Sequence, residues 1–297
     1  MLIIEQQVLA AAKVNLYLRV LGRRPDGYHD LDSVMVPIGL YDWLHIRIDR
    51  REFTHPQPRI TLTSDSPDAP SGPTNLAHRA AARLLSHLGQ NVNVEIHLRK
   101  RIPVGSGLGG GSSDAAATLV TVNRLLGSPL QAPELARIGG EIGADVPFFV
   151  YGSPARVGGR GENLTPMKLQ CSLPLVICSD GFVLSTREVY SLLDVSLTTG
   201  RCLSSIEPLV SGREPISAVL VNDLETAAAK LHPEVLSLKA RLVEHGALGA
   251  LMTGSGSAVF GIWPDLQLAE QAARHLRQRG LWAQAVQTVD ESLAVAS

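Results

Sequence analysis

The chain lacks the features that mark membrane and secreted proteins. No apolar run approaches the roughly 18 residues that a membrane-spanning helix needs. Residues 1–7 include an acid and no basic cluster, whereas a signal peptide opens with basic residues and continues into an apolar stretch. We therefore expect a protein that stays in the cytoplasm and has no membrane partner.

Cysteine is also scarce. Cys171, Cys178 and Cys202 are odd in number and widely spaced, and none belongs to a C-x-x-C pair or to a cysteine–histidine pattern typical of zinc sites. This spacing argues against a disulfide framework and against a zinc site. It predicts three reduced cysteines that serve packing.

Neither sign of charge dominates the composition. Lysine and arginine number 27 and aspartate and glutamate number 28, so the formal net charge is -1. A protein that binds nucleic acid or an anionic membrane usually carries an excess of basic residues. The balance therefore favours a small-molecule partner over nucleic acid.

Length and hydrophobic content indicate two globular units. The chain has 297 residues, of which 45% are hydrophobic, and this is more than one ordinary core accommodates. The composition turns glycine-rich and polar around residues 155–172. We expect the boundary there, with domains at 1–160 and 161–297, and we find no internal repeat.

The spacing of apolar residues predicts alternating strands and helices. From Val14 to Val20 apolar and polar residues alternate, which is typical of a strand with one buried face, and Lys13 and Asn15 share the opposite face. Further strands are expected near 44–48, 92–98, 173–178, 258–263 and 281–289, a strand fragment within 54–74, helices at 75–88, 112–126, 133–143, 186–193, 223–244 (broken at Pro233) and 265–279, and irregular structure at 196–215. Because regular βαβ repeats are missing, the predicted fold class is α+β.

The most informative segment lies between the strand at 92–98 and the helix that follows it. Residues 105–111 contain five glycines, which remove the side chains that keep a backbone away from a ligand. The N–H groups of such a loop and the N-terminus of the next helix together form an anion site. A flexible linker is the alternative, but flexible linkers do not connect a strand directly to an alanine-rich helix. The loop therefore predicts a phosphate-binding site.

Other phosphate-binding motifs match this loop less well. Gly105, Gly107 and Gly110 have the spacing of the dinucleotide fingerprint, but residues 115–133 lack the acid that would bind the ribose. No Gly-Lys-Ser/Thr follows the glycines, which excludes a Walker loop, and the His-Arg-Asp and Asp-Phe-Gly motifs of protein kinases are absent.

Three segments, in their order, resemble the motifs of the GHMP kinases, which include galactokinase, homoserine kinase, mevalonate kinase and phosphomevalonate kinase. They are residues 11–16, 103–113 and 253–256. The resemblance implies an ATP-dependent small-molecule kinase with a two-domain α+β fold. Its N-terminal domain would bind ATP and be of the ribosomal-protein-S5-domain-2-like type, and its C-terminal, substrate-side domain would be a ferredoxin-like α/β domain. Ala12, Ser106 and Ser257 depart from the usual motif residues, but none of these departures removes a functional group that the chemistry needs.

Two further strings narrow the resemblance. Residues 22–29 and 143–149 resemble those GHMP kinases whose acceptor is a cytidyl diphosphate-linked methylerythritol, and residues 222–225 also match. This implies phosphorylation of the 2-hydroxyl of that acceptor by ATP and Mg²⁺ in the non-mevalonate route to isoprenoids. Homoserine or mevalonate kinase activity is the alternative within the family, and a nucleotide-binding protein without catalysis is the alternative outside it.

The resemblance also assigns roles in the transfer itself. Asp145 is implied to be the base that accepts the hydroxyl proton, with Lys13 beside it to keep it ionised and oriented. From the residues alone, Asp145 could equally be a cap or turn acid. Asn15 and Thr186 are implied to hold the methylerythritol or its phosphates.

Further roles implied by the resemblance concern the two nucleotide groups. Tyr28 and Tyr190 would sandwich the cytosine ring and His29 would bind its edge. Whether Ser112 or Ser113 reaches Mg²⁺ stays open, and no carboxylate cage for the metal is expected because phosphates and water supply most of its ligands. The ATP-binding residues implied are Asn75, Lys100, Pro103, Val104, Gly105, Ser106, Gly107, Leu108, Gly109, Gly110, Gly111, Ser112 and Ser113.

Overall fold

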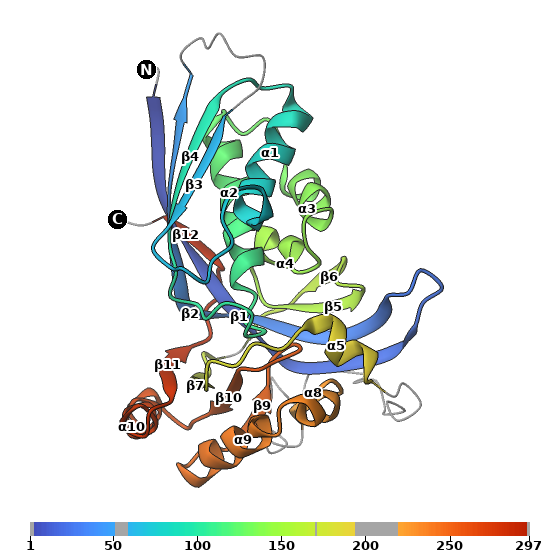
Figure 1. Ribbon diagram of the computed structural model, residues 1–297, viewed down its shortest axis with the longest axis vertical. Coiled ribbons are helices and arrows are strands. Elements are labelled where there is room, and N and C mark those ends of the chain that lie inside the picture. Colours follow the sequence, from blue (N-terminus) through green and yellow to red (C-terminus); the bar gives the residue numbers. More distant parts are fainter. Residues whose placement is uncertain (1–2, 51–58, 170, 194–218, 296–297) are drawn as a thin grey trace.

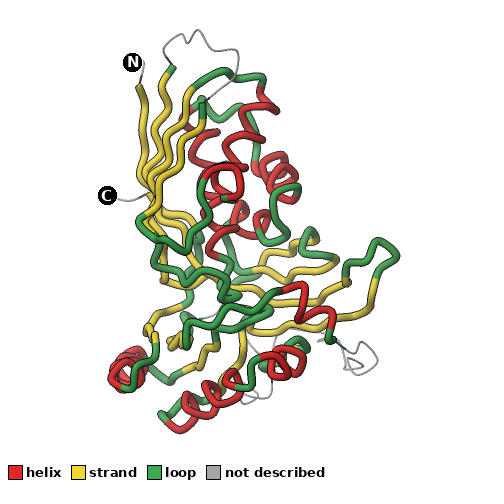
Figure 2. Tube along the Cα trace, in the orientation of Figure 1, coloured by secondary structure: helices red, strands yellow, loops and turns green. Residues whose placement is uncertain are grey.

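The computed structural model describes residues 3–50, 59–169, 171–193 and 219–295 of the chain. This part is an α+β fold built on two sheets with helices packed against them (Figure 1), and Figure 2 shows that strands and helices occupy separate layers. The predicted fold class is confirmed.

The first sheet has eight strands, and its main path follows the order β12-β1-β2-β4-β3. Its strands are β1 (Ile3–Arg23), β2 (His29–Asp49), β3 (Ile60–Ser64), β4 (Asn93–Arg99), β5 (Ala155–Gly159), β6 (Asn163–Pro166), β8 (Val221–Asn222) and β12 (Leu293–Val295). The second sheet is antiparallel, in the order β11-β7-β10-β9. Its strands are β7 (Pro174–Ser179), β9 (Gly249–Met252), β10 (Val259–Ile262) and β11 (Trp282–Gln287).

Helices pack on one side of each sheet (Figure 1). In the N-terminal part they are the short 3₁₀ helix η1 (Gly72–Thr74), α1 (Leu76–Leu88), α2 (Gly110–Leu125), α3 (Ala132–Gly140) and α4 (Val146–Tyr151). In the C-terminal part they are α5 (Thr186–Ser191), α8 (Glu225–Leu231), α9 (Glu234–Glu244) and α10 (Leu266–Gln278). Among the helices of the described residues, none is long and apolar enough to cross a membrane.

Three clusters of buried apolar side chains hold these layers together. Ile96 of β4 and Leu119 of α2 belong to the cluster between the first sheet and its helices. Leu238 of α9 belongs to the cluster under the second sheet. A third cluster, which includes Leu16 of β1 and Phe260 of β10, joins the two sheets. Burial of such side chains contributes roughly 1.5–3 kcal/mol each, so the contact between the sheets is part of the folded core.

The strand around Val14 to Val20 differs from its prediction. Alternation predicted one buried face, but Lys13 and Asn15 on the opposite face are each only 3% exposed. Two loops cover that face, because the Lys13 ammonium donates to the carbonyl of Gly107 and the Thr253 hydroxyl donates to Asn15 Oδ1. A strand pattern cannot reveal cover from loops far away in the sequence.

Most other predicted elements are confirmed. Helices α1, α5, α8, α9 and α10 lie where the sequence predicts helices. Helix α1 ends at Gly89, which has a φ of +61°. Helix α2 begins at Gly110, slightly earlier than predicted, and helix α4 and the strands β5, β6 and β12 were not predicted.

Several sequence predictions have other outcomes. Cys178 is buried, as expected for a packing residue, whereas Cys171 is exposed, so the packing prediction was wrong there. Cys202 and the irregular segment predicted at 196–215 lie outside the described residues. Strands β8 and β12 return to the first sheet after residue 160. The domain boundary at residue 160 therefore stays a prediction.

Candidate active site

The glycine-rich loop connects β4 to α2, as the sequence predicted. Gly109 is the N-cap of α2 with a φ of +75°, and the N–H of Ser113 donates to its carbonyl at 2.9 Å. Ser106, a departure from the usual motif, donates its hydroxyl to the carbonyl of Pro103 at 2.7 Å and so braces the loop internally. The loop and the positive end of α2 therefore have an arrangement that is typical of an anion site.

Gly107 shows why one loop position must be glycine. Its φ is +81°, and a Cβ atom there would overlap the carbonyl oxygen of Thr253 and lie 3.1 Å from the backbone nitrogen of Gly256. Because both neighbours are backbone atoms, they cannot move aside as a flexible side chain can. The phosphate loop thus fits closely against the loop at residues 253–257, which we call the third-motif loop.

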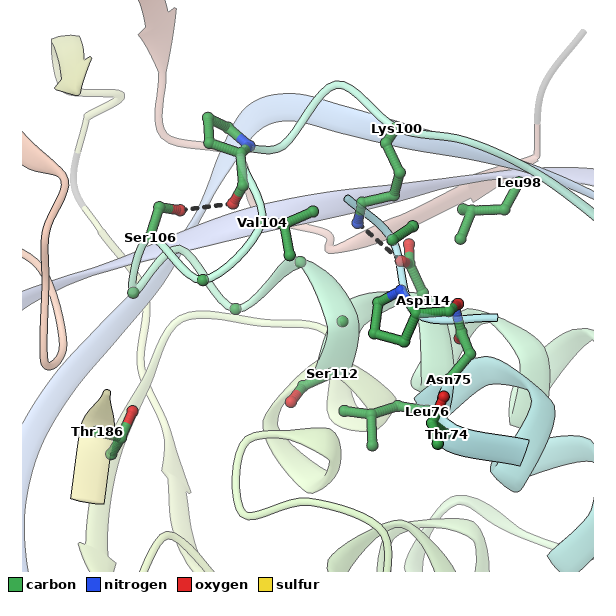
Figure 3. A pocket seen from close by; sticks show the side chains of 18 residues that line it. Thr74, Asn75, Leu76, Leu98, Lys100, Val104, Ser106, Ser112, Asp114 and Thr186 are labelled. Atoms are coloured by element: carbon green, nitrogen blue, oxygen red, sulfur yellow. Dashed lines mark hydrogen bonds and ion pairs between the residues drawn. The ribbon is translucent and has the colours of Figure 1, made fainter. Parts of the chain in front are cut away.

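A pocket of about 390 Å³ opens beside the phosphate loop (Figure 3). Thr186 lies on one side of it, and Ser112, Leu76 and Asn75 lie toward the other. The lining consists of Ala69, Pro70, Thr74, Asn75, Leu76, Leu98, Lys100, Pro103, Val104, Gly105, Ser106, Gly107, Gly109, Gly110, Gly111, Ser112, Asp114 and Thr186. Most of the predicted ATP-binding residues are therefore gathered around one space, whereas Leu108 and Ser113 are fully buried and do not line it.

Asn75 lies in the pocket wall as the N-cap of α1. Its Oδ1 accepts from the N–H of Ala77 at 2.9 Å, and its amide nitrogen donates to the carbonyl of Pro70 at 2.8 Å. These bonds hold the start of α1 against the chain before it. They leave few free positions on the amide for a nucleotide.

Lys100, also predicted to contact adenosine, is paired with two buried carboxylates. Its ammonium donates to Asp114 at 2.8 Å (Figure 3) and also to Asp42. The N–H groups of Arg101 and Ile102 also donate to Asp42 Oδ1, at 2.6 and 2.9 Å. Desolvation lowers the pKa of Lys100, but the two carboxylates outweigh it and the net pKa is raised. No pattern in the sequence indicates this Asp42–Lys100–Asp114 triad.

Asp114 is the weakly satisfied member of the triad. Its Oδ1 is buried without a hydrogen-bond partner among the described residues, whereas Asp42 accepts three hydrogen bonds. Desolvation raises the pKa of Asp114 to about 7, with Lys100 opposing the shift and Asp42 adding to it. The first turn of α2 therefore carries a buried acid beside the phosphate loop.

Lys13 and Asp145 are 132 positions apart in the sequence, but their charged groups lie close together next to the phosphate loop. Lys13 Nζ lies 3.7 Å from Asp145 Oδ2 and donates to Asn15 Oδ1 at 2.7 Å and to the carbonyl of Gly107 at 2.8 Å. Burial lowers the pKa of Lys13, and Asp145 partly offsets this. Asp145 is the N-cap of α4 but makes no capping hydrogen bond with its side chain. Its carboxylate is thus available beside the ammonium instead of serving the helix.

Asn15 and Thr186 both contact the third-motif loop. The N–H of Asn15 donates to Thr253 Oγ1 at 3.1 Å, and its amide nitrogen donates to Ser33 Oγ at 2.8 Å. The hydroxyls of Thr186 and Ser255 are 2.8 Å apart. Asn15 of β1 thus lies beside Lys13, and Thr186 joins the same loop from the start of α5.

The predicted aromatic residues lie at the far end of the β1–β2 hairpin. His29, and not Tyr28, stacks on Tyr190, with ring centroids 5.0 Å apart and planes at 29°. Tyr28 is 59% exposed, and the Arg160 guanidinium lies 5.0 Å from its ring centroid. Burial, with a contribution from Asp145, raises the pKa of Tyr190. Tyr190 therefore packs on the His29 ring and lies within electrostatic range of the Asp145 carboxylate. Arg160 is a further candidate that no sequence pattern indicated.

The residues around the phosphate loop fit a magnesium ion carried by a nucleotide. No group of three or more histidine, cysteine, aspartate or glutamate side chains that could hold a metal ion occurs among the described residues. Of the two serines left open by the sequence, Ser112 lines the pocket and Ser113 is fully buried. A single hydroxyl beside bound phosphates suits Mg²⁺, which keeps most of its ligands from phosphate and water.

Comparison with known proteins adds independent findings. Residues 75–153 match the family model of the GHMP kinases N terminal domain, and residues 212–280 match that of the GHMP kinases C terminal domain. The 4-diphosphocytidyl-2-C-methyl-D-erythritol kinase of Geobacter sp. (strain M21) is 43% identical over 284 residues, which cover 95% of this chain and 99% of the relative. The kinase of the same name from Moorella thermoacetica is 42% identical, covering 91% of this chain and 94% of the relative.

Solved structures agree with these sequence matches. A crystal structure of 4-(cytidine 5'-diphospho)-2C-methyl-D-erythritol kinase is similar with a TM-score of 0.78 and 38% identity, covering 96% of this chain and 99% of that one. A homoserine kinase from Cytophaga hutchinsonii has a TM-score of 0.74 at 19% identity, covering 98% and 97% of the two chains. At that identity the second likeness concerns the fold alone.

Proposed function

The chain belongs to the 4-diphosphocytidyl-2-C-methyl-D-erythritol kinases, a branch of the GHMP kinases, and on this premise we propose how its residues phosphorylate that acceptor with ATP. The reaction adds a phosphate to the 2-hydroxyl in the non-mevalonate route to isoprenoid precursors. The observation that carries the proposal is the contact of Lys13 with Asp145 beside the phosphate loop. A nucleotide-binding protein without catalysis would have no need for a buried lysine paired with this carboxylate.

In the proposed transfer, Asp145 is the base. Its carboxylate accepts the hydroxyl proton as the hydroxyl oxygen bonds to the γ-phosphorus and the bond between that phosphorus and the departing ADP breaks. Lys13 holds Asp145 in its ionised form and stabilises negative charge on the transferred group. The free carboxylate at the start of α4 and the 3.7 Å separation support these roles.

The acceptor would extend from this pair toward the tip of the hairpin. We propose that Asn15 and Thr186 hold the methylerythritol or its phosphates, and that the cytosine binds near His29, Tyr28 and Tyr190. Because His29 already stacks on Tyr190, the ring of the base would extend or replace that stack. The Arg160 guanidinium over Tyr28 offers a cation to the diphosphate at the same place.

The donor side would use the pocket beside the phosphate loop. We propose that the backbone of 103–113 binds the ATP phosphates, that Asn75 and Lys100 lie near the adenosine, and that Ser112 is the serine nearest Mg²⁺. When bound, Mg²⁺ neutralises charge on the phosphates and orients them for in-line transfer. The Asp42–Lys100–Asp114 triad supports a positioning role for Lys100, since its ammonium is already held by two carboxylates.

The proposal also includes the division of the chain into domains and the place of the reaction in the cell. We propose a division near residue 160, with an ATP-binding N-terminal domain and a C-terminal domain that adds Thr186 and Tyr190 to the acceptor side. We also propose that the reaction takes place in the cytoplasm, where ATP is supplied.

The test is an acceptor panel with the purified chain, ATP and Mg²⁺. Mass spectrometry should show one added phosphate on 4-diphosphocytidyl-2-C-methyl-D-erythritol and none on homoserine or mevalonate. The uridine analogue should lose at least about tenfold in kcat/KM, roughly 1.4 kcal/mol, because a site that pairs with a base edge leaves partners unsatisfied when donor and acceptor exchange. Preferential turnover of homoserine or mevalonate would overturn the proposed acceptor, and equal use of the uridine analogue would mean that stacking alone holds the ring.

A further inference from the structure

Residues 222–225, Asn-Asp-Leu-Glu, match the family in sequence but have no part in the transfer described so far. They begin at the end of β8, which pairs in parallel with β1 at Tyr17 and Leu18. They lead into α8, which is labelled in Figure 1. This position lies a few residues along β1 from Lys13 and Asn15. The motif therefore sits where the first sheet, the second sheet and the proposed active site meet.

The side-chain amide nitrogen and oxygen of Asn222 are both hydrogen-bonded to the backbone. Its nitrogen donates to the carbonyls of Met252 and Gly254, each at 2.8 Å, and its Oδ1 accepts from the N–H of Leu224 at 3.0 Å. The residue is 7% exposed. An amide has two N–H donors, and here both close on carbonyls that flank Thr253, which makes Asn222 a clamp on the start of the third-motif loop.

The clamped loop contacts the proposed active site at several points. Thr253 receives the N–H of Asn15, and Ser255 pairs with Thr186. Gly254 lies against Lys13, since a Cβ atom there would be 3.2 Å from the Lys13 ammonium nitrogen. A displacement of this loop would thus reach the transfer residues without altering any of them.

Glu225 makes a second attachment from the same motif. Its Oε2 accepts the N–H of Met252 at 3.1 Å, and its Oε1 pairs with Lys239 of α9. The third-motif loop is therefore tied at its start both to β8 and to the helices of the C-terminal part.

We propose that Asn222 is a positioning residue for phosphoryl transfer, which acts by holding the third-motif loop against Lys13 and Asn15; this rests on the proposed function. Its amide sets the two carbonyls beside Thr253 and touches no substrate. Misplacing reacting groups by about 1 Å can cost on the order of 10²-fold in rate even when the altered residue is remote. Loss of the clamp should therefore lower kcat more than it weakens binding.

The adjacent residue provides a matched control. Asp223 pairs with Arg19 at 2.8 Å and accepts the N–H of Val20 at 2.9 Å, so among the described residues its side-chain hydrogen bonds go to β1 and not to the third-motif loop. Asn222→Asp and Asp223→Asn are opposite exchanges of amide and acid at neighbouring positions, where Asn222 is buried and the Asp223 side chain is 7% exposed. Asn222→Asp keeps the oxygen that accepts from Leu224, but it replaces the two N–H donors to the carbonyls of Met252 and Gly254 with a carboxylate oxygen that repels them. Asp223→Asn instead removes the ion pair with Arg19, which lies on β1.

The experiment measures kcat, both KM values and the melting temperature of the wild type and the two variants. We expect kcat of Asn222→Asp to fall at least about tenfold with KM for ATP within about threefold of wild type, and Asp223→Asn to keep its kcat even where its melting temperature falls. Asn222→Ser replaces Asn222→Asp if the latter does not fold; it removes both amide N–H donors without adding charge and leaves one hydroxyl, which cannot bond both carbonyls at once.

The outcomes separate this inference from the proposed function. An inactive wild type refutes the function and with it the clamp's role, whereas an active wild type with wild-type kcat in Asn222→Asp or Asn222→Ser refutes the clamp alone. Equal losses of kcat in the Asn222 and Asp223 variants, or failure of both Asn222 variants to fold, would show that the motif serves stability and would overturn the inference.

Discussion

Asparagine at position 145 keeps the shape of the proposed base and removes its capacity to accept a proton. We expect kcat of Asp145→Asn to fall by roughly 10²–10⁴, with little change in KM, because the carboxylate acts on the hydroxyl and not on the nucleotide. Folding should survive, since the Asp145 side chain makes no capping hydrogen bond to α4.

The cost to stability follows from the Lys13 pair. At 3.7 Å, two unit charges attract by about 4 kcal/mol at an effective dielectric constant of about 20. The Asp145 side chain is 35% exposed, so water screens part of that attraction. The expected loss is on the order of 1–2 kcal/mol in the free energy of unfolding, within the roughly 5–15 kcal/mol that folded proteins have.

Lys13→Met completes a double-mutant cycle. Alone it should also depress kcat, and because the two residues act as one unit the double variant should be far less impaired than the product of the single defects implies. In stability, the double variant should lose less than the sum, because Asp145→Asn leaves the buried ammonium without its counter-charge and Lys13→Met removes that ammonium.

Steady-state kinetics and urea unfolding of the four proteins test both cycles. Multiplicative losses in kcat would show that the residues act separately. A near-normal kcat in Asp145→Asn would refute the assignment of the base, and the hydroxyl proton would then pass directly to phosphate or solvent.

Two further predictions concern the phosphate loop and the triad. Gly107→Ala should lower the free energy of unfolding by more than the roughly 1–2 kcal/mol that a left-handed alanine costs, and should reduce kcat/KM for ATP at least about tenfold, because its Cβ would overlap Thr253. The control Gly89→Ala, with φ +61° and open space around the Cβ, should show only the left-handed cost and normal kinetics. Equal kinetics in the two variants would refute the close fit of the loops. Because the pKa of Asp114 is raised from 3.8 to about 7, the folded state binds a proton more tightly than the unfolded chain, so the free energy of unfolding should fall as pH rises through that window, by at most about 1.4 kcal/mol per pH unit. Urea unfolding across that range should show a weaker fall in Asp114→Asn, and an unchanged slope would show that Lys100 keeps Asp114 ionised.

The sequence was sufficient for features that are local. Glycine spacing before a helix predicts the phosphate loop, and apolar periodicity predicts α1, α9 and α10, because both depend on neighbours a few residues away. The shared face of Lys13 and Asn15 is also a local property of a strand, and the two side chains are indeed hydrogen-bonded.

Contacts between distant segments needed either the family resemblance or the structure. Asp145 shares no local pattern with Lys13, and only the resemblance brought the two together. No sequence pattern predicts the contact of Asp42 with Lys100, 58 positions away, because that contact depends on the pairing of β2 with β4. The stack of His29 on Tyr190 likewise depends on α5 packing beside the hairpin.

Backbone contacts explain why the departures from the usual motifs leave the arrangement around Lys13 intact. The N–H of Lys13 donates to the carbonyl of Leu108 at 2.9 Å, and the N–H of Ala258 donates to that of Ser106 at 3.1 Å. The bond to the Ser106 carbonyl does not depend on the side chain at that position, so serine is tolerated there, whereas Gly107 admits no Cβ atom. The phosphate loop, β1 and the third-motif loop are thus joined before any ligand binds. Little binding energy is then needed to order them, and more is available to align the hydroxyl with the γ-phosphate.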